Sequence, residues 1–381
     1  MHQVVEASTS IASRMTFQQF LASAGLLAYS VVATPAVADI RIAVAGPMKG
    51  QFAAFGEEMR MGAEKAVADL NAAGGVNGET LVLETVDDGC DADQAVAVAN
   101  QLIGRDVVFV AGHLCFSSSI AAAEVYAGAG IVQMSPATTL PKFTDERQGE
   151  GIFRLAPRDD RQADVAGKLL VNEFGDKRIA ILHDKTAYGK GLADAVKAVV
   201  NELGTSESMA LGFDAGGDDF RSLVSQLKLQ AVDVVYLGGY HPEAGLIKLE
   251  MDRQRLGAVL VAGDALMTED YWSVTGEAGN GTLLTYPEIP RDRPEAQELV
   301  ADLEAAGGSA DRFTLTTYAA IQAWAQAVEV AGGTALQGVA TALQEGTFDT
   351  VLGDVTFDGN GDSNLPDYIV YEWRNGVPEA R

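Results

Sequence analysis

The sequence predicts an α/β protein made of two doubly wound parallel-sheet lobes. Three observations lead to this fold. Short apolar runs alternate with segments of helical spacing, the alternation occurs as two separate series, and the chain of 381 residues is long enough for two domains. The runs that read as strands are almost continuously apolar, which is typical of parallel strands covered by helices on both faces. We therefore expect two lobes, with a break between them near residues 154–161.

The first series begins at residue 40 and alternates four strands with three helices. Its strands are expected at 40–45, 81–86, 107–112 and 131–134. Its helices are expected at 57–71, 93–103 and 117–129, where small and apolar residues recur at helical spacing. This order is typical of one parallel sheet with its crossover helices.

The second series begins at residue 179 and repeats the pattern. Its strands are expected at 179–182, 209–211, 232–237 and 258–261, with helices at 191–203, 220–228 and 242–254. A third, mostly helical segment at 294–331 lies between two candidate crossovers, 285–290 and 357–362. Composition alone does not say which lobe receives this segment.

The charge balance excludes some classes of partner. Acidic residues outnumber basic ones 53 to 27, which gives a formal net charge of -26. A chain this acidic repels phosphate backbones and anionic lipid, so we expect no nucleic-acid partner and no polybasic membrane docking.

Residues 1–38 read as a cleavable export signal rather than as part of the fold. Arg14 precedes an apolar run at 21–33, and the segment ends in Pro35-Ala36-Val37-Ala38. A short buried helix and a membrane anchor are the alternatives, but the run is shorter than the ~20 residues that a membrane span needs. We expect cleavage after Ala38 and an exported mature chain.

Two cysteines, Cys90 and Cys115, are the only ones in the chain. An even count without CxxC spacing in an exported protein favours one structural disulfide, and a catalytic thiol is the alternative. A disulfide closing this loop would contribute about 3 kcal/mol on the chain-entropy model.

The sequence carries no signature of catalysis. It lacks a Gly-x-Ser-x-Gly elbow, a phosphate-binding GxxxxGK[ST] loop and an HExxH helix. The run 358–362 is similar to a calcium loop, but Ser363 and Ile369 stand where Gly and an acid are needed, so a turn is favoured. We expect no enzyme activity, cofactor or metal, with an exported hydrolase as the rival hypothesis.

Several short motifs, in order along nearly all of the mature chain, resemble the periplasmic branched-chain amino acid binding proteins. The motifs include both cysteines and are Asp87-Asp88-Gly89-Cys90-Asp91 with the run 94–100, Gly112-His113-Leu114-Cys115, His183-Asp184-Lys185 with Tyr188-Gly189-x-Gly191-Leu192, and Gly238-Gly239-Tyr240-His241-Pro242-Glu243.

The resemblance implies a type I periplasmic binding protein, whose two lobes are joined by a three-crossover hinge. It implies lobe 1 at 39–157 plus 286–357, lobe 2 at 158–285 plus 358–381, and a disulfide between Cys90 and Cys115. It further implies a monomer in the periplasm that delivers a small-molecule ligand, an amino acid with a branched-chain or other small aliphatic side chain, to a membrane ABC permease.

The ligand's chemistry selects candidate site residues. A carboxylate needs hydroxyl and N–H donors, which the loops at 115–118 and 137–139 can offer, and an ammonium needs an acid, for which Asp264 is placed after a strand. By resemblance, the ligand contacts fall on aromatic and small polar positions in both lobes: Phe55, Ala137, Thr139, Tyr188, Tyr240, Asp264 and Phe313.

One position departs from the family. Phe116 stands where the family usually has Ser, which leaves the N–H groups of Phe116 and Ser117, with the Ser117 hydroxyl, to bind a carboxylate. An amide- or urea-type ligand for a binding or sensing protein of the same fold is therefore the alternative. Structural roles compete at other positions: Thr139 could cap a turn, Asp264 could cap a helix through 269–271, and Asp159 could cap a helix through 162–171.

Overall fold

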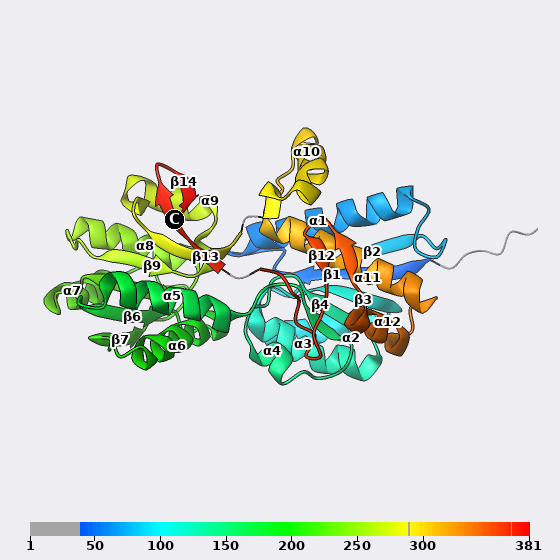
Figure 1. The fold of residues 1–381 in the computed structure, drawn as a ribbon, viewed down its shortest axis with the longest axis horizontal. Coiled ribbons are helices and arrows are strands. Elements are labelled where there is room, and N and C mark those ends of the chain that lie inside the picture. Colours follow the sequence, from blue (N-terminus) through cyan, green and yellow to red (C-terminus); the bar gives the residue numbers. More distant parts are fainter. Residues whose placement is uncertain (1–38, 289, 367) are drawn as a thin grey trace, which may run out of the picture. The chain divides into compact units, whose positions relative to one another are not determined.

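The computed structural model describes residues 39–288, 290–366 and 368–381 (Figure 1). The predicted export signal at 1–38 lies outside the described residues. Two sheets and a small hairpin account for all strands in the described part of the chain. No helix among these residues has both the length and the apolar character that crossing a bilayer requires.

The first sheet has five parallel strands in the order β2-β1-β3-β4-β5. Its elements in chain order are β1 (Ile40–Gly46), α1 (Ala53–Ala72), β2 (Leu81–Asp87), α2 (Ala92–Ile103), β3 (Val107–Gly112), α3 (Phe116–Ala129), β4 (Val132–Ser135), α4 (Lys142–Asp145) and β5 (Ile152–Arg154). The four predicted strands are confirmed, and β5 is a further strand of three residues.

The third segment, 294–331, and the residues that follow it up to 355 pack on this first sheet. They contain α10 (Gln297–Ala305), α11 (Arg312–Ala331), α12 (Leu336–Glu345) and the hairpin β11 (Phe348–Thr350) and β12 (Gly353–Val355). Trp324 of α11 stacks on Phe109 of β3 with ring centroids 4.8 Å apart. Helix α11 also approaches α1 so closely that a Cβ added to Gly62 would lie 2.1 Å from the carbonyl oxygen of Thr314. The hydrophobic core of lobe 1 therefore includes this distant part of the chain.

The second sheet has seven strands in the order β14-β13-β10-β9-β8-β6-β7. Its elements are α5 (Asp159–Phe174), β6 (Ile179–His183), α6 (Ala187–Glu202), β7 (Met209–Gly212), α7 (Arg221–Leu229), β8 (Val234–Gly238), α8 (His241–Arg253), β9 (Val259–Ala262), α9 (Glu269–Thr275), β10 (Leu283–Pro287), β13 (Tyr368–Arg374) and β14 (Val377–Ala380). The four predicted strands are parallel, whereas β13 runs antiparallel to both β10 and β14. Helices cover both faces, as the doubly wound fold requires (Figure 1).

The chain passes between the sheets three times. It leaves the first sheet after Arg154, returns to the first lobe after Pro287, and enters the second sheet again at Tyr368. Residues 285–287 pair with β13, so their assignment to a crossover is wrong.

The run 358–362 forms the predicted turn, in which the Asp358 N–H donates to the carbonyl of Asp362. It stays with lobe 1, because the Arg154 N–H donates to the carbonyl of Gly361. We therefore propose lobe 1 as 39–157 plus 290–365 and lobe 2 as 158–287 plus 368–381, in place of boundaries at 286 and 358.

The predicted disulfide between Cys90 and Cys115 is confirmed, with Cα atoms 5.3 Å apart. It ties the loop after β2 to the start of α3. Next to it, Nδ1 of His113 lies 2.5 Å from Oδ2 of Asp88, and Nε2 lies 3.1 Å from the Tyr126 hydroxyl. His113 is thus a buried structural residue. Asp88 is buried as well, whereas Asp91 of the same loop caps α2 by accepting the Gln94 N–H.

Candidate ligand-binding site

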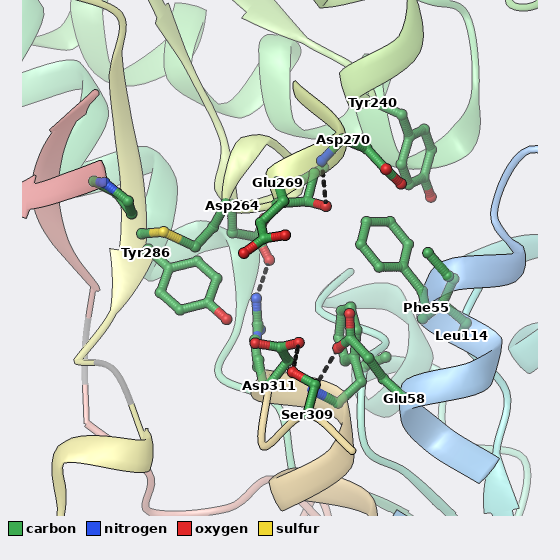
Figure 2. Close-up of a pocket in the computed structure, with 18 of the residues that line it drawn as sticks. Phe55, Glu58, Leu114, Tyr240, Asp264, Glu269, Asp270, Tyr286, Ser309 and Asp311 are labelled. Carbon is green, nitrogen blue, oxygen red and sulfur yellow. Dashed lines mark hydrogen bonds and ion pairs between the residues drawn. The ribbon is translucent and has the colours of Figure 1, made fainter. Parts of the chain in front are cut away.

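A cavity of about 820 Å³ lies between the two lobes. Figure 2 shows Phe55 and Glu58 projecting from α1 toward this cavity, with Asp264 and Tyr286 on its other side. Eight of the nine residues expected to contact a ligand line it: Phe55, Phe116, Ala137, Thr139, Tyr188, Tyr240, Asp264 and Phe313.

The loop after β4 is held in place by hydroxyl groups. Ser135 Oγ donates to the carbonyl of His113 at 2.7 Å and accepts the N–H of Thr138 at 2.8 Å. Thr138 itself hydrogen-bonds to Ser119, which fixes the loop to α3. The next hydroxyl, Oγ1 of Thr139, is buried and has no hydrogen-bond partner among the described residues. A buried hydroxyl is costly to leave unpaired, so Thr139, which lies beside Asp159 and lines the cavity, is a candidate donor to a ligand.

The start of α3 forms a second part of the lobe 1 wall. Phe116 is 4% exposed and its ring contacts Tyr188 edge-on at 5.4 Å. The first N–H groups of a helix have no partner within the helix, so this turn can offer donors. Ser117 is different, because its side chain is exposed and does not line the cavity. The cavity therefore does not support the prediction that the Ser117 hydroxyl contacts the ligand.

Glycines bring Tyr188 and Tyr240 together in lobe 2. A Cβ on Gly238 would lie 2.1 Å from the carbonyl oxygen of Gly189, so α6 and the end of β8 meet at backbone distance. Thr186 caps α6 by accepting the Gly189 N–H at 2.9 Å. The two tyrosine rings then lie 4.9 Å apart. The glycines of these two motifs are thus explained by close packing of backbone.

Asp264 does not cap the following helix, as one reading of the sequence allowed. Thr268 caps α9 instead, by accepting the Asp270 N–H. Asp264 Oδ1 accepts hydrogen bonds from the Tyr188 hydroxyl at 2.8 Å and from Gln162 Nε2 at 3.2 Å. The Asp264 side chain is 9% exposed, so these bonds hold a buried carboxylate.

Arg312 is the cavity residue that sequence reasoning missed. It is the first residue of α11, it is 6% exposed, and its Nη1 donates to Oδ2 of Asp264. Its guanidinium also lies 5.0 Å from the ring centroid of Tyr286. This ion pair joins a lobe 1 helix to a lobe 2 loop across the cavity.

Two further acids close to the cavity carry strongly raised pKa values. Burial raises the pKa of Glu58 to about 8, and the neighbouring Asp311 adds to the shift, although Glu58 accepts the Phe313 N–H. Burial also raises the pKa of Asp159 to about 8; the charge of Asp264 raises it further, whereas the Thr139 hydroxyl and the cations Arg154 and Arg312 lower it.

The remaining wall is aromatic. Phe55 and Phe313 meet edge-on with ring centroids 5.3 Å apart, and Phe55 also contacts the His241 ring at 5.5 Å. Phe52 lies 4.5 Å from Tyr240. These rings form an apolar surface beside the Asp264–Arg312 pair, an arrangement that suits a small ligand with one polar and one apolar end.

Comparisons with known proteins agree with this architecture. Residues 39–377 match the family model for periplasmic binding proteins. The chain is 44% identical over 340 residues to the Leu/Ile/Val-binding protein homolog 2 of Brucella abortus, which covers 89% of this chain and 91% of that one. It is 42% identical to an amino acid binding protein of Pseudomonas aeruginosa, over 92% and 95% of the two chains.

Solved structures agree with the fold. A leucine binding protein, LivK, of Thermotoga maritima has a TM-score of 0.82 at 25% identity, covering 90% of this chain and 97% of that one. The substrate binding protein LivJ of Streptococcus pneumoniae, in complex with isoleucine, has a TM-score of 0.79 at 20% identity, covering 90% and 99%, and supports the fold alone. With its family match and these relatives, the chain belongs to the periplasmic binding proteins, a family of solute-binding, non-enzymatic proteins.

Proposed function

We propose that this protein is the periplasmic solute-binding component of an ABC importer and that it binds a branched-chain or other small aliphatic amino acid. The observation that carries the proposal is a single cavity lined by the Asp264 carboxylate, the unpartnered Thr139 hydroxyl and several aromatic rings. The names of the relatives, Leu/Ile/Val-binding and amino acid binding proteins, support the ligand class.

In this proposal the ligand carboxylate lies against lobe 1. Thr139 Oγ1 donates to it, together with the N–H groups of Phe116 and Ser117 at the start of α3. The positive end of the helix dipole favours an anion at this place. The Ser117 hydroxyl is not needed, since the backbone N–H contributes whatever the side-chain orientation.

The ligand ammonium lies against the carbonyl of Ala137 and the Asp264 carboxylate. The aliphatic side chain packs against Phe55, Tyr188, Tyr240 and Phe313. Because these groups come from both lobes, a bound ligand favours the arrangement in which all of them reach it. Binding thereby prepares a shape that a membrane permease can recognise.

The partners and location follow from the same proposal. We infer that the mature chain begins after Ala38, acts in the periplasm as a monomer and delivers its ligand to a membrane ABC permease. The net charge of -26 belongs to a protein that stays dissolved rather than bound to anionic lipid.

Isothermal calorimetry tests the proposal on the mature chain after unfolding and refolding to strip bound ligand. Leucine, isoleucine and valine are compared with glutamate, acetamide and urea. We expect at least one aliphatic amino acid to bind with a Kd of about 1 μM or below. A response to acetamide or urea alone would contradict the amino-acid assignment and favour the alternative ligand class.

A matched pair of variants tests the site itself. Thr139→Val removes the unpartnered hydroxyl and should weaken leucine binding about ten-fold, as expected for a hydrogen bond to a charged group. Thr341→Val is the control, because Thr341 is an exposed residue of α12 whose hydroxyl donates to the Gln337 carbonyl. Equal affinities of the two variants would remove Thr139 from the binding site.

A further inference from the structure

Arg312 pairs with Asp264, the acid that is proposed to face the ligand ammonium. Its Nη1 donates to Asp264 Oδ2, and the pair is almost fully buried, with 4% and 9% of the two side chains exposed. The guanidinium is held over the rings of Tyr286 and Phe313, at 5.0 and 5.3 Å from their centroids. The positive charge in this wall of the cavity is therefore fixed in place.

The ion pair with Arg312 changes which ligand groups Asp264 can bind. Tyr188 and Gln162 donate to Oδ1, and Arg312 donates to Oδ2, so three of about four acceptor positions on this carboxylate are in use. A second cation beside Oδ2 would meet the charge of Arg312 at short range in a poorly solvated place. Asp264 therefore does not require a ligand ammonium for charge balance.

Arg312 also carries a second N–H donor, Nη2, that Asp264 does not use. Its Nη2 is buried and makes no hydrogen bond of normal geometry among the residues that the structure describes, and the Tyr368 hydroxyl is a neighbour of the guanidinium. A guanidinium presents its N–H groups in a fork that matches a carboxylate. Arg312 and Thr139 both line the cavity.

From these contacts we propose that Arg312 is a specificity-determining residue, which binds the ligand carboxylate through Nη2 and cancels the charge of Asp264. The site then accepts aliphatic 2-hydroxy and 2-oxo carboxylates about as well as the corresponding amino acids. This inference rests on the proposed function, since it concerns the same cavity and the same aliphatic side chain. It assigns the obligatory ligand group to the carboxylate and makes the ammonium optional.

Calorimetry with three probes of matched side chain separates the two head groups. Leucine carries both charges, 4-methyl-2-hydroxypentanoate carries the carboxylate alone, and 3-methylbutylamine carries the ammonium alone. For the refolded mature protein we expect leucine and the hydroxy acid to bind within about ten-fold of each other, and no binding of the amine.

Replacing Arg312 should make the ligand ammonium contribute to affinity. Arg312→Met removes the carboxylate donor and exposes the charge of Asp264, so both carboxylates should weaken about ten-fold or more. The ratio of affinities should then move about ten-fold in favour of leucine. Arg312→Lys keeps the charge without the fork, so it should weaken both carboxylates while leaving their ratio near that of the parent protein.

Arg253→Met is the matched control. Arg253 is at the end of α8, its side chain is 71% exposed, and it pairs with Glu250 away from the cavity. This variant removes one positive charge and should leave all three affinities unchanged. If Arg312→Met fails to fold, as judged by its circular dichroism melt, the parent protein and Arg312→Lys still test the inference.

The outcomes separate this inference from the function on which it rests. Binding of leucine at least about 100-fold tighter than the hydroxy acid, or a ratio that Arg312→Met leaves unchanged, would overturn the role of Arg312 and leave amino-acid binding intact. Absence of binding for every amino acid and every probe would overturn both.

Discussion

Asp264 and Asp159 are two buried aspartates in the same neighbourhood, yet their surroundings differ. Asp264 receives hydrogen bonds from Tyr188, Gln162 and Arg312. Both carboxylate oxygens of Asp159 lack a hydrogen-bond partner among the described residues, and Asp159 is 1% exposed. The comparison teaches that burial alone does not decide the charge of a carboxylate. Asp264 is paired with Arg312, whereas burial and the nearby charge of Asp264 raise the pKa of Asp159 to about 8.

The largest effect should come from removing the charge of Asp264. Asp264→Asn leaves the buried Arg312 without its counter-ion, which typically costs about 3 kcal/mol in the free energy of unfolding. Leucine affinity should also fall about ten-fold or more, because the wall of the cavity becomes positive. Urea denaturation and calorimetry measure the two effects.

Asp214→Asn is the control for this substitution. The Asp214 side chain is 86% exposed and pairs with Lys185 on the surface, so its loss should change stability by less than about 0.5 kcal/mol. Similar losses for both variants would mean that the Asp264–Arg312 pair contributes no more than a surface ion pair.

Replacing Asp159 should raise the free energy of unfolding, whereas replacing Asp264 lowers it. The pKa of Asp159 rises from 3.8 to about 8 on folding, so the folded state holds a proton that the unfolded state releases between these values. The resulting stability is fully present below pH ~4 and is lost as pH rises through ~8.

Asp159→Asn removes this dependence. Since one pKa unit corresponds to about 1.4 kcal/mol, the variant should gain at least ~2 kcal/mol relative to the parent between pH 5 and pH 9. Glu58, whose pKa is also raised to about 8, is present in both proteins and cancels in the difference. Parallel curves of unfolding free energy against pH would contradict a protonated Asp159.

The smallest effect should come from removing one donor of Asp264. Tyr188→Phe deletes the hydroxyl that donates to Oδ1 at 2.8 Å and leaves the ring contacts with Phe116 and Tyr240 in place. A hydrogen bond to a charged group is worth about 1.5 kcal/mol, so stability should fall by about that amount. Thermal unfolding of Tyr188→Phe beside Asp264→Asn ranks the two. A loss equal to that of Asp264→Asn would place the energy in the tyrosine bond rather than in the ion pair.

The sequence predicts the sheets well where strands are buried. Runs such as 107–112 and 234–238 are apolar on both faces and leave little choice of structure. The strands β13 and β14 were missed, because Tyr368–Arg374 alternates buried and exposed residues and the strands pair antiparallel at the sheet edge. The continuously apolar pattern of the parallel strands therefore does not detect β13 and β14.

The site was predicted from motifs rather than from contacts. Tyr188, Tyr240 and Asp264 were placed correctly in one cavity, but Asp264 was expected to face a ligand alone. Its partner Arg312 was missed because one arginine between Asp311 and Phe313 reads as a solvated residue. A signal was present: a cation in the first turn of a helix opposes the helix dipole, so its occurrence there points to a specific acidic partner.

Because the chain passes between the sheets three times, each lobe can finish folding only after distant segments have been synthesised. Phe109 of β3 is covered only after Trp324 has been synthesised, and β10 gains its second neighbour only after Tyr368–Arg374 has been synthesised. A polypeptide that stops at Pro287 therefore matches no self-sufficient folding unit, although it contains two long βα series. During synthesis both halves must finish late and nearly together, and a C-terminal truncation of as few as 14 residues would remove β13 and β14 from the second sheet.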